Sequence, residues 1–163
     1  MLLLFFISCS VSAFAQKPIE KLLKKYNTES IPYVSAEELR RLQTHETVII
    51  LDSREVNEYA VSHIETARLV GYNDFSSEEI SAEIQNKNTA IIVYCSLGIR
   101  SEEIGEKLKK SGFTNVKNLY GGIFEWKNAG YPVINSAGKE TDTIHTYSKA
   151  WSKWLLKGEK VYD

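Results

Sequence analysis

Short runs of consecutive apolar residues alternate along the chain with segments in which apolar residues recur every three or four positions. Continuous apolar runs occupy residues 48–51 and 90–94, and three further strand candidates, at 31–34, 67–70 and 116–119, mix apolar with other residues. Short β-branched runs are typical of buried strands, and the longer periodicity between them predicts helices that pack by one face. Strands and helices in this alternation predict an α/β fold with a mostly parallel central sheet flanked by helices on both faces.

Local signals at the ends of the periodic segments place the helices. Ser35 and Ser76 are each followed three residues later by a glutamate, which is the capping-box signature of a helix start. A helix is expected over about residues 101–111, because Gly112 supplies a left-handed C-cap. Short helices are expected at 55–59 and after residue 121, the second ending at Gly130.

Both ends outside this core carry amphipathic patterns. Residues 16–30 include a predicted helix whose apolar positions recur with helical spacing: Ile19, Leu22, Leu23 and Tyr26. Residues 135–163 form a C-terminal tail, in which a second amphipathic, aromatic helix is predicted from Tyr147, Trp151, Trp154 and Leu155. The favoured interpretation is that both helices pack on the domain at 31–134. The alternative is contact with a membrane surface or a protein partner.

The first fifteen residues differ from the rest of the chain. They contain no charged side chain and end in the small-x-small pattern of Ala13, Phe14 and Ala15. This pattern predicts a signal peptide cleaved after Ala15, and therefore an exported protein, periplasmic or secreted. The alternative is a lipoprotein signal with a lipidated Cys9. After cleavage at Ala15, Cys95 is the sole cysteine, so the mature chain forms no internal disulfide.

Charge and composition exclude several function classes. The chain has 20 lysines and arginines against 21 aspartates and glutamates, for a net charge of −1, and no segment forms a basic stripe of the kind that binds nucleic acid. The three histidines are scattered, and together with one cysteine they make no ligand cluster. We therefore expect neither a metal nor another cofactor.

The run at 90–94 leads into the most reactive position of the sequence. Cys95 follows it directly, a short loop with Gly98 and Arg100 comes next, and a helix begins at about Ser101. Loop amides and the positive end of a helix favour an anion, and the same field lowers the pKa of a thiol. We expect Cys95 to be a nucleophile at the carboxyl end of the sheet, where α/β proteins bind ligands, rather than an inert buried cysteine.

Three stretches resemble the rhodanese-like, or sulfurtransferase, family, and the resemblance covers residues 31–134. Residues 51–64 contain Asp-x-Arg, then Glu-Tyr, then His-Ile, similar to the family's Asp-x-Arg…Glu-Tyr…Gly-His-Ile segment. Residues 94–101, Tyr-Cys-Ser-Leu-Gly-Ile-Arg-Ser, resemble its active-site loop, and residues 119–133 resemble its closing Gly-Gly…Trp…Gly-Tyr-Pro motif. The resemblance implies a rhodanese-like three-layer sandwich.

The resemblance also implies a reaction. Cys95 would accept a sulfane sulfur from thiosulfate or another small sulfur-containing anion, and a thiol or cyanide acceptor would then take the sulfur. The substrate-binding residues would be Ser96, Leu97, Gly98, Ile99, Arg100 and Ser101. Arg100 would orient the anion, with a loop-stabilising ion pair as the alternative. Asp52 and Arg54 are expected to support the loop as a structural charge pair, and His63 is expected to be a structural histidine.

The sequence departs from the family pattern at three places. Ser62 replaces the usual glycine before His-Ile, and Glu65 with Thr66 replaces the common Pro-Gly turn, which questions the local turn. Glu102 and Glu103 follow the loop directly. Carboxylates suit a helix N-terminus, but at this place they would compete with an anionic substrate.

Two other functions are weighed against sulfur transfer. Cysteine phosphatases and arsenate reductases also place a cysteine loop and an arginine at a helix N-terminus, with five residues between the two. Four residues separate Cys95 from Arg100, and the shorter loop favours a transferable sulfur over a phosphate ester. The second alternative is a rhodanese module that carries persulfide sulfur with little turnover or binds a partner.

Overall fold

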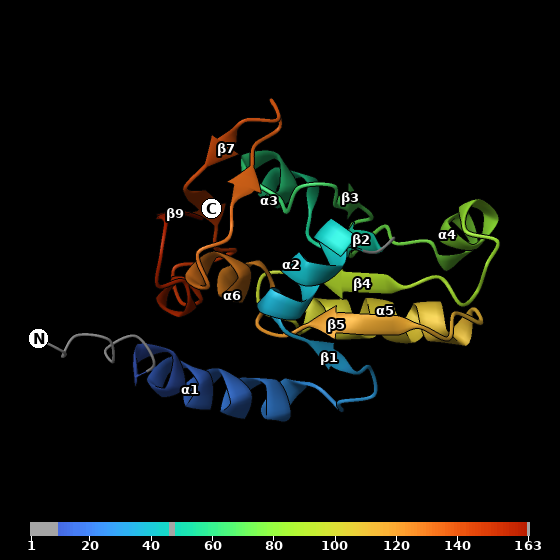
Figure 1. Cartoon of the computed structure of the whole chain (residues 1–163), viewed down its shortest axis with the longest axis horizontal. Helices are drawn as coiled ribbons and strands as arrows, with labels where there is room; N and C mark the ends of the chain where they lie inside the picture. The colour runs from blue at the N-terminus through green and yellow to red at the C-terminus, as the bar shows by residue number, and fades with distance from the viewer. Residues whose placement is uncertain (1–9, 46–47, 163) are drawn as a thin grey trace, which may run out of the picture.

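A five-stranded parallel sheet forms the centre of the computed structural model, which describes residues 10–45 and 48–162 (Figure 1). The strand order is β1-β5-β4-β2-β3. The strands are β1 (Tyr33–Val34), β2 (Ile49–Asp52), β3 (Arg68–Leu69), β4 (Ile91–Tyr94) and β5 (Val116–Leu119). Strand β4 pairs with β2 on one side and β5 on the other, so the residue that follows it, Cys95, lies at the middle of the sheet's carboxyl edge.

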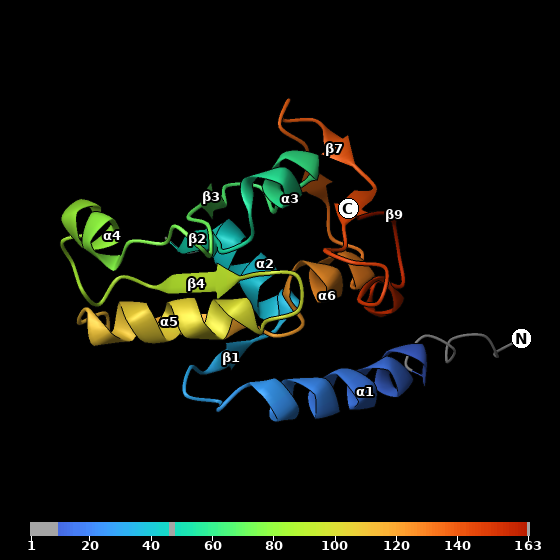
Figure 2. The same cartoon turned by 180° about the vertical axis from the view of Figure 1, so that it is seen from behind.

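Helices cover both faces of the sheet. They are α1 (Ser10–Tyr26), α2 (Ala36–His45), α3 (Val56–Val61), α4 (Ser77–Glu83), α5 (Arg100–Lys110) and α6 (Gly122–Asn128). One buried apolar cluster includes Leu23, Leu39 and Phe124 from α1, α2 and α6, and a second includes Ile80 and Leu108 from α4 and α5. Helix α2 lies in front of the sheet in Figure 1, and α5 lies in front in the reverse view of Figure 2. The predicted three-layer α/β architecture is confirmed.

The helix-start signals act as the sequence predicts. Ser35 Oγ accepts the backbone N–H of Glu38 at 3.1 Å, and Ser76 Oγ accepts that of Glu79 at 3.2 Å. Each serine satisfies an amide that a helix N-terminus otherwise leaves unpaired. At the other end of α5, Gly112 has a φ of +95°, the left-handed conformation expected of a glycine C-cap.

The N-terminal helix packs on the domain. Ile19 and Leu23 of α1 are buried in the first cluster, whereas Tyr26 is 56% exposed and lies outside it. The predicted amphipathic helix therefore packs on the domain through Ile19 and Leu23. Residues 1–9, which include Cys9 and much of the predicted signal peptide, lie outside the described residues. Over the ranges that are described, we find no helix with the length and apolar character needed to cross a bilayer.

The helix predicted for the C-terminal tail is wrong. After β6 (Val133–Ile134), the chain forms β7 (Glu140–Thr141), β8 (Thr143–His145), a single turn of 3₁₀ helix η1 (Ser152–Trp154) and β9 (Glu159–Val161). Strands β8 and β9 pair in parallel. Tyr147 has a φ of +63°, which an α-helix does not admit. The tail nevertheless packs on the domain, because Ile144 and Leu155 are fully buried in the first cluster.

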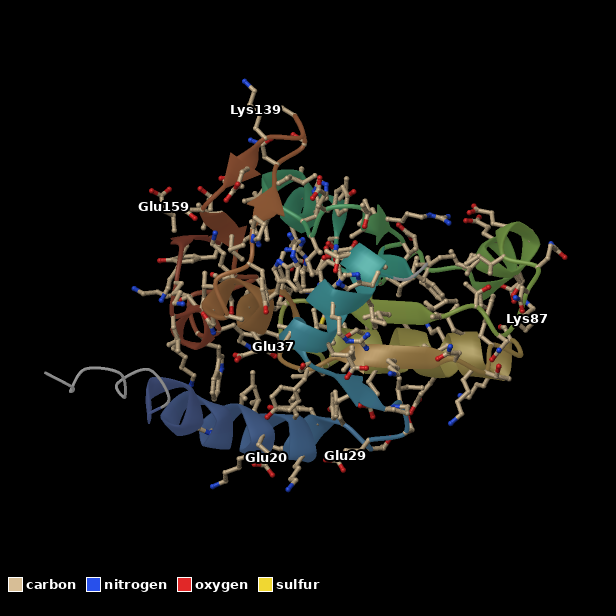
Figure 3. The ribbon with its side chains drawn as sticks, in the orientation of Figure 1. Glu20, Glu29, Glu37, Lys87, Lys139 and Glu159 are labelled. Carbon is tan, nitrogen blue, oxygen red and sulfur yellow. The ribbon has the colours of Figure 1, made fainter. Side chains whose placement is uncertain are left out.

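Charged side chains are spread over the surface. Glu20 and Glu29 project near α1, whereas Lys139 and Glu159 project from the C-terminal segment (Figure 3). Acidic and basic residues therefore share the surface, in keeping with the net charge of −1.

Candidate active site

The loop after β4 folds around the sulfur of Cys95. This side chain is fully buried, and its Sγ accepts the backbone N–H of Gly98 at 3.1 Å and faces the hydroxyl of Ser101 at 3.6 Å. Gly98 has a φ of +100°, and an added Cβ would lie 3.2 Å from the carbonyl oxygen of Leu119. Both the turn and the close packing therefore require glycine at position 98.

Opposing effects set the acidity of the thiol. Burial raises the pKa of Cys95, because a thiolate loses solvation. The charge of Arg100, the hydroxyl of Ser101 and the backbone N–H groups of Ser101 and Gly98 outweigh burial, so the pKa lies below its ordinary value. Since α5 begins at Arg100, the positive end of its dipole lies at this loop. The site thus favours a thiolate at Cys95.

Arg100 forms a buried ion pair with Glu58. Its two terminal nitrogens donate to the two carboxylate oxygens at 2.7 and 2.8 Å, and one of them also donates to Ser96 Oγ at 3.1 Å. The side chains are 13% and 1% exposed. Burial raises the pKa of Glu58, but Arg100 and the backbone N–H of Glu55 lower it by more, so the carboxylate stays charged. The loop-stabilising ion pair foreseen as an alternative is therefore present.

Asn118 on β5 holds the loop from below. Its Oδ1 accepts the hydroxyl of Ser101 at 2.7 Å, and its Nδ2 donates to the carbonyl of Gly98 at 2.8 Å. Neither Asn118 nor the role of Glu58 was predicted from the sequence. The available signal was an asparagine directly before Leu119 in a predicted strand of the sheet, since a buried polar side chain in such a place needs partners.

Helix α6 closes the loop from the other side. The backbone N–H of Ile123 donates to the carbonyl of Cys95 at 2.9 Å, and that of Phe124 donates to the carbonyl of Ser96 at 3.2 Å. A Cβ at Gly122 would lie 2.3 Å from the carbonyl oxygen of Cys95. The glycine pair of the closing motif therefore lets a helix N-terminus pack directly on the reactive loop.

Asp52 and Arg54 form a buried support beneath the loop. Arg54 donates to both carboxylate oxygens of Asp52, at distances down to 2.7 Å, and Tyr94 donates to the same carboxylate at 2.6 Å. Tyr94 is the residue before Cys95, so the charge pair anchors the end of β4. His63 stacks on Tyr59 with ring centroids 3.8 Å apart, as a structural histidine would.

The family's Pro-Gly turn is kept without its usual residues. The backbone N–H of Ala67 donates to the carbonyl of Ile64 at 3.0 Å, which closes a four-residue turn. Thr66 occupies the third position with a φ of +69°, where glycine is normally required. The carbonyl of Ser62 accepts Arg54 at 2.7 Å. The local fold therefore tolerates both departures.

The two glutamates after the loop have partners of their own. Glu102 is buried, and its carboxylate accepts the backbone N–H of Thr28 at 2.8 Å. Glu103 accepts the hydroxyl of Tyr72 at 2.5 Å. Glu102 is thus committed to the segment that follows α1. Within the described ranges, no three histidine, cysteine, aspartate or glutamate side chains gather as metal ligands.

Comparisons with known proteins agree with this geometry. The model of the rhodanese-like domain family matches residues 35–129. YrkF, a candidate sulfur carrier protein of Bacillus subtilis (strain 168), is 35% identical over 101 residues, which are 61% of this chain and 53% of YrkF. A tRNA uridine(34) hydroxylase of Photorhabdus laumondii is 32% identical over 108 residues, 62% of this chain and 31% of that enzyme. The chain thus spans about half of the first relative and less of the second.

Solved structures share the fold. A thiosulfate sulfurtransferase from Pseudomonas aeruginosa superposes with a TM-score of 0.61 at 23% identity, covering 77% of this chain and 23% of that one. A rhodanese-like domain from Anabaena superposes with a TM-score of 0.58 at 25% identity, covering 64% of this chain and 79% of the domain.

Proposed function

The chain belongs to the rhodanese-like domain family, and on that premise we propose that it moves sulfane sulfur from thiosulfate or a related donor to a thiol or cyanide through a persulfide on Cys95. One observation carries the proposal. The only cysteine of residues 16–163 lies at the carboxyl edge of the sheet, with its sulfur 3.1 Å from a loop N–H and its pKa lowered. A thiolate held by backbone donors is suited to nucleophilic sulfur chemistry.

The first half-reaction loads the enzyme. The Cys95 thiolate attacks the outer sulfur of thiosulfate, a new S–S bond forms at Cys95, and the S–S bond of the donor breaks. Sulfite leaves with the electron pair of that bond. The negative charge of the terminal persulfide sulfur would be met by the loop N–H groups of residues 96–101. Arg100 would contribute a positive field while Glu58 holds it in place.

The second half-reaction unloads it. An acceptor thiolate or cyanide attacks the terminal sulfur of the persulfide, and the S–S bond to Cys95 breaks. The products are an acceptor persulfide or thiocyanate, and the electron pair returns to Cys95 as thiolate. The backbone N–H groups of Gly98 and Ser101 would stabilise the thiolate at both ends of this cycle, while Asn118 accepts the hydroxyl proton of Ser101 and holds that side chain beside the sulfur.

A slow sulfur carrier that hands its persulfide to a protein partner is the second candidate. It is favoured by the complete burial of Cys95 and by the likeness to YrkF over half of that protein's length. A carrier would form the same persulfide but would turn over slowly with small acceptors.

Export is part of the proposal and is supported by the uncharged segment that ends at Ala13-Phe14-Ala15. N-terminal sequencing of the protein purified from cells tests it. A mature chain that begins at Gln16 supports export through a cleaved signal, whereas an intact Met1 in a cytoplasmic fraction contradicts it.

Intact-protein mass spectrometry tests the chemistry. The wild-type chain should gain one sulfur atom after thiosulfate treatment and lose it to cyanide, and Cys95→Ser should gain none. The sulfurtransferase proposal is refuted if no sulfane donor gives a sulfur adduct on a folded protein whose Cys95 can still be alkylated. Steady-state turnover with cyanide and small thiols then separates an enzyme from a slow carrier.

A further inference from the structure

The C-terminal segment reaches the reactive loop although it lies outside the matched family domain, which ends at residue 129. Figures 1 and 2 both show this segment beyond the carboxyl ends of β4 and β5. There the ring of Tyr147 lies over the guanidinium of Arg100, with Cζ 5.0 Å from the ring centroid. This geometry is that of a cation–π contact. Tyr147, which lies outside the matched family domain, therefore contacts a residue of the candidate site.

The backbone at Tyr147 is strained. Its φ is +63°, and the backbone N–H of Ser148 donates to the carbonyl of Thr146 at 2.6 Å, which closes a three-residue turn around it. Turns of this sense are rare, and a bulky residue rarely takes a positive φ. Such strain persists only where the surroundings impose it, and it gathers at functional sites.

The surroundings that impose it are well packed. The backbone N–H of Thr146 donates to the carbonyl of Val161 on β9 at 2.7 Å, and Ile144 is buried in the core. Nδ1 of His145 accepts the backbone N–H of Tyr147 at 3.1 Å. The ring of Trp151 lies 5.3 Å from that of Tyr147. The tyrosine is thus positioned by a fixed frame.

The ring of Tyr147 lies against Arg100, the residue at which the reactive loop passes into α5. Glu58 occupies the hydrogen-bonding edge of Arg100, and Tyr147 covers a face of the guanidinium. The Arg100 side chain is 13% exposed and Cys95 is fully buried, whereas Tyr147 is 50% exposed. The tyrosine ring is therefore a layer between solvent and the charged rim of the loop.

We propose that Tyr147 is a specificity-determining residue, whose ring limits the size of the molecules that reach Cys95. Small anions such as thiosulfate pass, and donors or acceptors with a bulky group next to the reacting sulfur are held out. The part of this inference that concerns donors rests on the proposed function. The part that concerns access to the thiol does not.

A size series of donors tests the first part. Thiosulfate, methanethiosulfonate and benzenethiosulfonate all present a sulfane sulfur. With the thiosulfonates, the Cys95 thiolate takes that sulfur and a sulfinate leaves with the electron pair of the broken S–S bond. We expect Tyr147→Ala and Tyr147→Gly to raise kcat/KM for the benzene compound relative to the methane compound about tenfold. Tyr147→Phe keeps the ring and should keep the wild-type ratio.

Alkylation of Cys95 tests the second part without any sulfur transfer. The ratio of the rates with N-phenylmaleimide and iodoacetamide should rise in Tyr147→Ala and Tyr147→Gly and stay unchanged in Tyr147→Phe. Tyr162→Ala removes another half-exposed tyrosine of the same segment and should change neither ratio. The glycine variant also fits the left-handed backbone, so a test remains if the alanine variant fails to fold.

The outcomes separate the two proposals. Unchanged alkylation ratios in the folded alanine and glycine variants overturn the role of Tyr147, as does a Tyr147→Phe variant that behaves like Tyr147→Ala. A shifted alkylation ratio in a protein that never forms a persulfide retains the role of Tyr147 and rejects sulfur transfer.

Discussion

Replacing Glu58 by glutamine removes the negative partner from the buried ion pair that holds Arg100. The glutamine has nearly the same shape and keeps one carbonyl oxygen for a hydrogen bond. The guanidinium, with its side chain only 13% exposed, loses its counter-charge and one strong acceptor. The change therefore perturbs charge while it leaves packing intact.

The structure sets the expected magnitude. Removing one partner of a buried ion pair costs about 3–5 kcal/mol, because the remaining charge stays desolvated. Since glutamine keeps an acceptor, we expect a loss of about 3 kcal/mol, or roughly a hundredfold in the unfolding equilibrium. A domain with a stability of about 5–15 kcal/mol would remain folded.

Urea denaturation of the wild type and two variants measures this loss. The matched control is Glu38→Gln, which removes the same charge from a surface ion pair with Lys117. In that pair the side chain of Glu38 is 41% exposed and that of Lys117 is 36% exposed. Such a pair contributes about 0–1 kcal/mol. Glu58 has a lowered pKa in the folded state. Its contribution to the free energy of unfolding is therefore fully present above the ordinary pKa of a carboxylate. This contribution is lost as the pH falls through the lowered pKa of the folded state. The gap between wild type and Glu58→Gln should accordingly narrow in acid.

The same variant makes a second prediction about the thiol. The alkylation rate of Cys95 should rise with pH through a pKa below that of an ordinary cysteine, because Arg100 and the loop donors favour the thiolate. With Glu58 neutralised, the field of Arg100 is less compensated, so this pKa should fall further. Equal losses of stability in Glu58→Gln and Glu38→Gln would refute the reasoning from burial. A Cys95 pKa that rises in Glu58→Gln would refute the assumption that Arg100 keeps its place.

Two further substitutions probe the frame of the site. Asn118→Ala should lower kcat for sulfur transfer and cost about 1–3 kcal/mol of stability, because it removes the 2.7 Å acceptor of the buried Ser101 hydroxyl and one donor to the Gly98 carbonyl. Wild-type turnover at an unchanged urea midpoint would contradict this. Thr66→Gly should raise the melting temperature by about 2–4 °C. Glycine adopts the φ of +69° without strain, and we expect a net gain in stability of roughly 1 kcal/mol. Calorimetry checks the second change, and a lower melting temperature would show that Thr66 is not strained.

Much of the fold was predictable because each central element combines a local signal with a matching hydrophobic pattern. The stretches at 48–51, 90–94 and 116–119 form strands that place Ile50, Val93 and Leu119 in the core between the helices. The capping serines bond as their sequence positions predict. The helix predicted for the C-terminal tail was wrong for a physical reason. Its spacing matched one helical face, but residues 147–155 connect β8 to β9, and the parallel pairing of these two strands leaves only one 3₁₀ turn, η1, in the connection. Local periodicity carries no information about such pairing.

The candidate site divides in the same way. Cys95, Gly98 and Arg100 lie within six consecutive residues, so their shared loop and the field at a helix start follow from the local sequence alone. The groups that hold this loop in place could not be predicted in the same way. Glu58 and Asn118 belong to other elements, and the order of the strands in the sheet is what brings them to the loop. The sequence by itself thus determined the family and predicted Cys95 as the nucleophile. Only the tertiary structure decided what neutralises Arg100 and that Tyr147 covers it, because these contacts join residues 42 and 47 positions apart.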